Sequence, residues 1–109
     1  MTTVPVPSPI QKMIDATNRG DNAAFAAVFS GDAFVSDGGR EFHGRDGAAS
    51  WNSTDNIGVG ARFQLRDVRP GHGDGQYLVD VSVTSHRFNG DGTFDIHVDG
   101  DQITRFIVS

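Results

Sequence analysis

One acidic side chain, Asp37, stands where an apolar segment meets a glycine turn, and it is the residue best placed for chemistry. Phe34-Val35-Ser36 precedes it and Gly38-Gly39 follows it. A carboxylate among apolar neighbours is poorly solvated, so it accepts a proton near neutral pH more readily than an exposed one does. Asp37 is therefore a candidate general base. The alternative is that Asp37 bonds the backbone of its own turn, as aspartate before glycine often does.

Two side chains that follow this segment could serve the same site. No serine or cysteine nucleophile motif accompanies any of the four histidines, so a surface position is the default interpretation for each of them. His43 is the only one that we assign as a catalytic candidate, because it lies close to the Asp37 turn. Trp51 is the single tryptophan. It could stack on a ring-shaped ligand with its indole nitrogen as a donor, or it could simply belong to the core.

A stripe of possible metal ligands occurs near the end of the chain. Asp95, His97, Asp99 and Asp101 occupy every second position, and side chains two apart share one face of a strand. The spacing does not fit a calcium loop, because the twelfth position counted from Asp95 is Phe106 instead of a glutamate. The sequence therefore favours a solvated hairpin with turn-forming aspartates, and we expect no metal.

Composition limits the class of protein. The chain has 109 residues, no cysteine, a formal net charge of -5 and a pI near 5.0. An acidic chain with scattered Lys and Arg does not predict nucleic-acid binding. No segment approaches the roughly 20 apolar residues that span a bilayer, and no signal peptide is recognisable. We expect a cytoplasmic protein with a lead-in at residues 1–8, which carry three of the four prolines, and a single domain at 9–109.

The elements that must position Asp37 begin with two helices. Apolar residues recur at helical spacing after Pro9, and Gly20 predicts the end of the first helix. Asp21 is a plausible N-cap for a second helix, which the pattern extends to Phe29. The sequence Ser30-Gly31-Asp32 then predicts a break.

A sheet follows, with one helix between its strands. We expect a strand at 33–37, a pairing segment at 41–43, a short helix at 46–53, and strands around 62–66, 77–85, 93–98 and 102–108. Five residues lie on the apolar faces of the predicted helix and strands and should pack beneath the helices: Phe25, Phe29, Val79, Val81 and Val83. A meander of strands with helices on one face belongs to the α+β class.

This order of elements resembles the nuclear-transport-factor-2-like superfamily, in its ketosteroid-isomerase and SnoaL-like branch. The resemblance rests on three segments, Ala16–Asp21, Phe29–Asp37 and Gly44–Ala48. It implies a cone-shaped, curved antiparallel sheet, cystatin-like, wrapped around about three helices, with one apolar cavity. It also implies a homodimer formed through the outer face of the sheet, where Leu78 lies.

Carried over residue by residue, the resemblance makes Asp37 the proton-transfer base. The oxyanion tyrosine of ketosteroid isomerases falls on Met13, and their protonated acid falls at or next to Phe94. Because each such donor typically supplies a few kcal/mol of barrier lowering, these departures argue against steroid isomerisation. We expect the pocket to be lined by the following residues: Met13, Phe34, Trp51, Phe63, Val83 and Phe94.

Three functions are compatible with these observations. The first is a pocket protein that binds a small hydrophobic molecule and performs cofactor-free proton transfer, as in isomerisation or cyclisation, with Asp37 as base. The second is a non-catalytic dimeric ligand-binding or interaction module. The third is an epoxide-hydrolase-like enzyme of the same fold, which would need two aspartates and an arginine to converge in the pocket, for example Asp37 with Arg62 or Arg105.

Overall fold

The computed structural model describes residues 5–108 of the chain. Three helices and one short 3-10 helix have these bounds: α1 Ser8–Arg19, α2 Asn22–Ala27, α3 Gly44–Asp55 and η1 Ile57–Val59. Six strands have these bounds: β1 Phe29–Asp37, β2 Arg40–His43, β3 Arg62–Pro70, β4 Gln76–Thr84, β5 Gly90–Asp99 and β6 Gln102–Val108. Within residues 5–108, no helix is long and apolar enough to cross a membrane.

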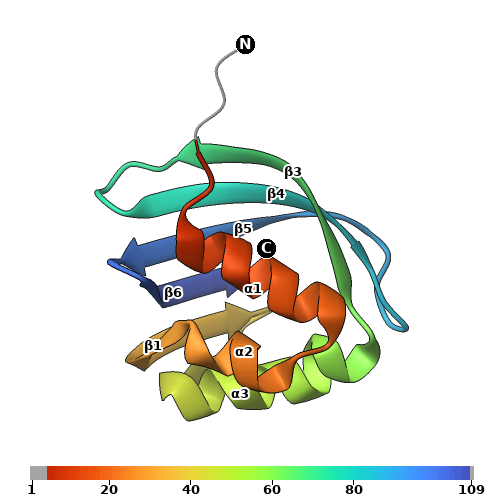
Figure 1. Ribbon diagram of the computed structural model, residues 1–109. Helices are drawn as coiled ribbons and strands as arrows, with labels where there is room; N and C mark the ends of the chain where they lie inside the picture. Colours follow the sequence, from red (N-terminus) through yellow and green to blue (C-terminus); the bar gives the residue numbers. More distant parts are fainter. Residues whose placement is uncertain (1–4, 109) are drawn as a thin grey trace.

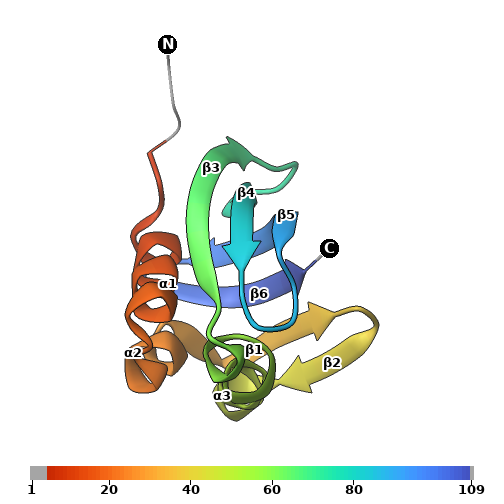
Figure 2. The same ribbon diagram turned by 90° about the vertical axis from the view of Figure 1, so that its right-hand side faces the viewer.

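The six strands form one curved, open sheet, and α1 lies across one of its faces (Figure 1). The strand order is β2-β1-β6-β5-β4-β3, so β2 and β3 are the two edges. Seen from the side, the strands bend around the helices, with α1 next to β3 and α3 beneath β1 (Figure 2). The α+β class and the curved sheet around three helices are confirmed.

The sheet is mixed, whereas an antiparallel sheet was expected. The last strand, β6, lies between β1 and β5, and it pairs antiparallel with β5 but parallel with β1. The other neighbouring strands pair antiparallel. The sequence analysis treated the strands as a local meander, and the insertion of the final strand beside the first is a non-local pairing that local patterns do not encode.

The two N-terminal helices are capped as predicted. Gly20 ends α1 with a left-handed φ of 67°, and its N–H bonds the Thr17 carbonyl. The Asp21 carboxylate accepts a hydrogen bond of 3.0 Å from the Ala24 backbone N–H at the start of α2. The first helix begins at Ser8, one residue earlier than expected. Half of the predicted lead-in, residues 1–4, lies outside the described residues.

The predicted break after Phe29 does not occur. The second helix ends at Ala27, and Phe29 already belongs to β1. Two bonds hold this segment extended: the Ile103 N–H donates to the Val28 carbonyl at 2.7 Å, and Arg45 Nε donates to the Phe29 carbonyl at 2.9 Å. The pairing with β6 shifts register between Phe29 and Phe34, so the polar residues between them are accommodated as an irregularity.

A chain of aromatic rings runs through the core from α2 to the sheet. Successive centroids lie 4.8–6.1 Å apart along the path Phe25, Phe29, Phe106, Phe94 and Phe63. Four of the five residues that were expected to pack beneath the helices are fully buried, and Val83 is half-buried. This core supports one side of a cavity, to which Phe94 and Phe63 contribute.

Candidate functional site

A cavity with a volume of about 480 Å³ lies among the described residues. It lies where the end of α3, the β1–β2 hairpin and the β4–β5 loop approach one another (Figure 2). Its apolar lining comes from Trp51, Val59, Ala61, Phe63, Val83, Phe88, Phe94 and Val108. Its polar side chains are those of Asp37, Arg40, Asp55, Asn56, Ser85 and Arg87. An apolar cavity with a few convergent polar groups is the usual form of a small-molecule site.

The strand period places Asp37 on the inner face of the sheet. Ala33 and Val35 are buried on that face, and Asp37 is the next residue in the same alternation. The chain then reverses through Gly38 and Gly39, whose φ values of 60° and 89° are ones that glycine adopts without strain. The sequence therefore brings the carboxylate to the cavity wall at the very end of β1.

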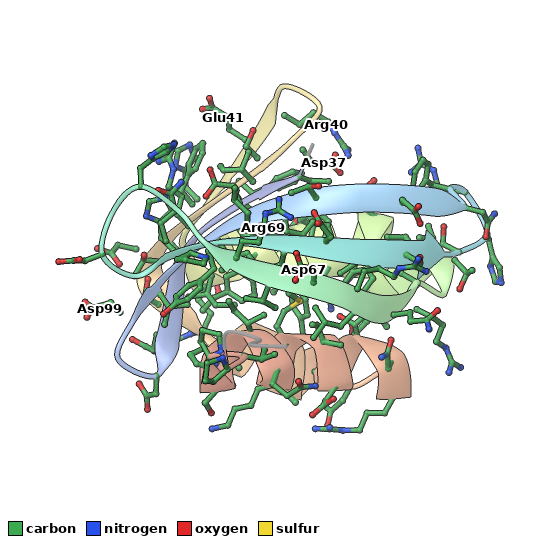
Figure 3. All side chains as sticks on the ribbon, turned by 90° about the horizontal axis from the view of Figure 1, so that it is seen from above. Asp37, Arg40, Glu41, Asp67, Arg69 and Asp99 are labelled. Carbon is green, nitrogen blue, oxygen red and sulfur yellow. The ribbon has the colours of Figure 1, made fainter. Side chains whose placement is uncertain are left out.

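Two side chains hold one oxygen of Asp37. Trp51 Nε1–H donates to Oδ2 at 2.9 Å, and Arg40 Nη2 donates to the same atom at 3.3 Å. Asp37 and Arg40 stand together at the end of the hairpin (Figure 3). The carboxylate makes no hydrogen bond to the backbone of its own turn within residues 5–108, so these contacts do not support the turn interpretation. Its side chain is 28% exposed, and Oδ1 receives no bond from the described side chains.

A second carboxylate, Asp55, anchors the mouth of the cavity. Its side chain is only 7% exposed at the end of α3, and Oδ1 lies 3.1 Å from Arg40 Nη2 and 3.2 Å from Arg87 Nη1. Thr54 Oγ1–H donates to its other oxygen at 2.8 Å. Burial alone would raise the pKa of Asp55, but the hydrogen bonds and charges of Arg40, Thr54 and Arg87 outweigh it and place the pKa below its ordinary value. Asp55 is therefore ionised at neutral pH.

Arg40 links the two carboxylates. Its Nη2 is shared between Asp37 and Asp55, and the pKa of its guanidinium is raised, mainly through its hydrogen bond and charge interaction with Asp55. The epoxide-hydrolase-like alternative required two aspartates and an arginine at one place, and the structure supplies that set as Asp37, Arg40 and Asp55. Neither Arg62 nor Arg105 lines the cavity.

Trp51 is both a core residue and a wall of the cavity. Its ring packs against Phe25 and Phe106, with centroids 6.1 and 5.3 Å away, and its side chain is buried. Because its N–H is bound to Asp37, the indole is not a free donor for a ligand. Phe63, Val83 and Phe94 also line the cavity, as the sequence analysis expected.

Three predicted site residues lie elsewhere. Phe34 is an odd number of positions from Asp37 and therefore points to the outer face of the sheet, where its ring lies 4.8 Å from the Arg105 guanidinium. His43 is opposite Phe34 in the hairpin and 72% exposed, with Nε2 3.7 Å from a Glu41 oxygen. Met13 is fully buried in the core and does not line the cavity.

The sequence analysis did not identify Arg40, Asp55, Asn56 or Arg87. Only Arg40 had a usable signal, because a hairpin turn of two glycines places it directly opposite Asp37. In β5, His97 Nε2 lies 3.6 Å from an Asp95 oxygen. Asp99 is exposed at the end of the same strand, away from Asp37 (Figure 3). No group of three His, Asp or Glu side chains suited to a metal occurs in the part of the chain that the structure describes.

Comparison with models of protein families gives no match, and no curated protein matches the chain. Solved structures do match. A proposed polyketide cyclase from Sinorhizobium meliloti superimposes with a TM-score of 0.84, at 20% identity and with 95% of each chain covered. A nuclear-transport-factor-2-like protein of unknown function from Cytophaga hutchinsonii has a TM-score of 0.77, at 9% identity over 99% of this chain and 93% of its own.

A proposed ketosteroid isomerase from Kribbella flavida has a TM-score of 0.76, at 16% identity over 92% of this chain and 73% of its own. Structural similarity at such low sequence identity indicates a shared fold and does not identify the reaction. The helices, the curved sheet and these superpositions together show that the chain has the nuclear-transport-factor-2-like fold.

Proposed function

We propose that this protein binds a small hydrophobic molecule in the cavity and that Asp37 acts on it as a general base, in a cofactor-free proton transfer such as isomerisation, cyclisation or dehydration. The observation that carries the proposal is the inward carboxylate of Asp37 in a largely apolar cavity. Trp51 and Arg40 both bond Oδ2, which orients the carboxylate and leaves Oδ1 for a ligand. A base must reach the proton that it removes, and Oδ1 can do so.

Proton removal next to a carbonyl group builds negative charge on the carbonyl oxygen, which needs a hydrogen-bond donor. The residues at the two family donor positions, Met13 and Phe94, cannot donate, and the Trp51 N–H is already bonded. The donors in position are the largely exposed guanidinium groups of Arg40 and Arg87 at the mouth. A substrate would therefore place its apolar body inside and its carbonyl group toward the mouth.

The structural neighbours support a role with small molecules. Two of these proteins are proposed to be a polyketide cyclase and a ketosteroid isomerase, names that refer to reactions of organic molecules. A cavity of about 480 Å³ is within the usual range of small-molecule sites. Shared fold alone does not transfer a reaction. The support for proton transfer is therefore the position of Asp37.

The test uses 5-nitrobenzisoxazole, a flat apolar probe whose ring opens when a base removes one proton. The proton passes to the carboxylate, the ring N–O bond breaks, and a coloured cyanonitrophenolate is released. We expect the protein to accelerate this reaction over buffer, and we expect Asp37→Asn to remove at least nine-tenths of the acceleration. Asp99→Asn, at an exposed turn, is the matched control and should keep the wild-type rate.

A rate unchanged by Asp37→Asn would reject Asp37 as the base. Entry of the probe is followed separately by the indole N–H signal of Trp51, which is the only tryptophan in the chain. Movement of that signal without any acceleration would favour the non-catalytic ligand-binding alternative.

A second candidate is the hydrolysis of an epoxide, which the contact of Arg40 with both Asp37 and Asp55 favours. Asp37 would take a proton from the attacking water, and the epoxide oxygen would need a proton as its C–O bond breaks. The lowered pKa of Asp55 makes that residue a poor proton donor, which is why proton transfer is placed first. If the protein converts styrene oxide to its diol and Asp37→Asn loses this activity, epoxide hydrolysis becomes the first candidate and proton transfer the second.

A further inference from the structure

Asn56 is a buried polar residue of the cavity to which neither proposed reaction assigns a role. It follows α3 directly, is 1% exposed and lines the cavity. Its Nδ2 donates to Thr17 Oγ1 at 3.1 Å and to Asn52 Oδ1 at 3.0 Å. Both hydrogens of the amide are therefore used within the protein, on the side that faces α1 and α3.

The orientation of the Asn56 amide follows from its neighbours. Asn52 Oδ1 also lies 3.5 Å from the backbone N–H of Ile57, and a backbone N–H can only donate. The oxygen of the Asn52 amide must therefore face Ile57 and Asn56, and its nitrogen faces Asn22, in agreement with the bond of 2.8 Å from Asn52 Nδ2 to Asn22 Oδ1. Asn56 has to present its NH₂ group to that oxygen, so its own Oδ1 points the other way.

The Asn56 oxygen is open to the cavity. No donor within residues 5–108 bonds Asn56 Oδ1, yet no fully enclosed side-chain oxygen or nitrogen of these residues is without a partner. Asn56 Oδ1 therefore keeps some accessible surface, and because Asn56 lines the cavity, we infer that this oxygen faces it. A buried acceptor left without a hydrogen bond is unfavourable, so this atom favours a ligand that can donate one.

The cavity thus offers two acceptors and few donors. Asp37 Oδ1 and Asn56 Oδ1 receive no bond from the described side chains, whereas the Trp51 N–H is bonded to Asp37 and the Ser85 hydroxyl donates to the Phe88 carbonyl. The remaining donors, Arg40 and Arg87, lie at the exposed mouth. A ligand that enters fully must bring its own hydrogen-bond donors. Because Asp37 is already paired with Arg40, neutral donors suit the cavity better than an ammonium group.

We propose that Asn56 is a ligand-binding residue and that the ligand is a hydroxylated apolar molecule, with one hydroxyl on Asn56 Oδ1, while Asp37 Oδ1 faces the proton that it removes in the proposed reaction. This inference rests on the proposed function, since it takes the cavity as the ligand site, and it adds the class of molecule that the site selects.

The test compares 1,5-dihydroxynaphthalene with its dimethyl ether, which keeps the ring system and loses both donors. Binding to the ¹⁵N-labelled full chain is followed through the Trp51 indole signal and the side-chain amide signals of Asn56. We expect the diol to bind at least tenfold more tightly than the ether and to shift the Asn56 signals, which the ether should leave in place. Asn56→Ala should reduce the preference for the diol at least threefold, with little change in affinity for the ether.

Two results would overturn the inference. Equal affinity of the two compounds for the wild-type chain, with the Trp51 signal moving in both titrations, would reject the hydroxylated class while leaving the cavity as a ligand site. If neither compound moves the Trp51 signal up to millimolar concentration, the cavity is not a site for such ligands and the proposed function fails as well. The comparison of compounds on the wild-type chain decides the question even if Asn56→Ala does not fold.

Discussion

Phe29 is the residue whose loss should weaken the fold most clearly. Its side chain is fully buried at the junction of α2 and β1, and its ring lies 5.0 Å from that of Phe25 and 6.1 Å from that of Phe106. A buried aromatic side chain removes about 150–250 Å² from water, which corresponds to about 4–6 kcal/mol. Alanine keeps only the first carbon, and neighbouring rings fill the space only in part, so Phe29→Ala should cost about 3–5 kcal/mol.

The measurement is urea unfolding of the two proteins, followed by Trp51 fluorescence. A domain of this size has a total stability of roughly 5–15 kcal/mol, so the loss should be visible as a large fall in the midpoint with an unchanged slope. The melting temperature should fall by at least about 12 °C. Phe29→Leu, which keeps most of the volume, should cost less than about 1.5 kcal/mol.

Phe88 provides the matched control. Among residues 5–108 it is the large apolar side chain that remains exposed, at 54%, in the β4–β5 loop. Phe88→Ala should change the free energy of unfolding by no more than about 0.5 kcal/mol. A loss below about 1 kcal/mol for Phe29→Ala would refute the argument, because it would mean that the ring contacts described for Phe29 do not form in solution.

Two further predictions concern the cavity mouth and the outer sheet face. The pKa of Asp55 is lowered in the folded chain, so the contribution of Asp55 to stability is present above the ordinary carboxyl pKa and is lost as pH falls through the lower folded value. The difference in unfolding free energy between wild type and Asp55→Asn should therefore be full at neutral pH and shrink below about pH 4, with Asp99→Asn as the control. A difference that stays constant down to about pH 2 would contradict this prediction. We also propose a homodimer through the outer face of the sheet, around the half-buried Leu78. Sedimentation at micromolar concentration should give twice the chain mass of 11.7 kDa, and Leu78→Asp should give the mass of a single chain. A monomeric wild-type protein would reject the proposal.

Much of the local structure could be predicted from the sequence because its causes lie within a few residues. The glycine that ends α1, the aspartate that caps α2 and the two glycines that reverse the chain after Asp37 act through their own backbone preferences. The two-residue period of β1 also places the Asp37 side chain on the inner face. The same period excluded Phe34 from the cavity, because residues three apart in a strand face opposite sides, and the sequence analysis overlooked that consequence.

Only the tertiary structure decided how the site is completed. Asp55 meets Arg40 and Arg87 because α3 runs back beneath the hairpin and the β4–β5 loop comes down to its end. The open face of Asn56 depends on contacts with Thr17 and Asn52, two residues from different helices. The sequence by itself thus determined which elements form and that Asp37 faces inward. Its partners come from distant segments, and their meeting depends on packing of the whole chain, which no local pattern of residues encodes.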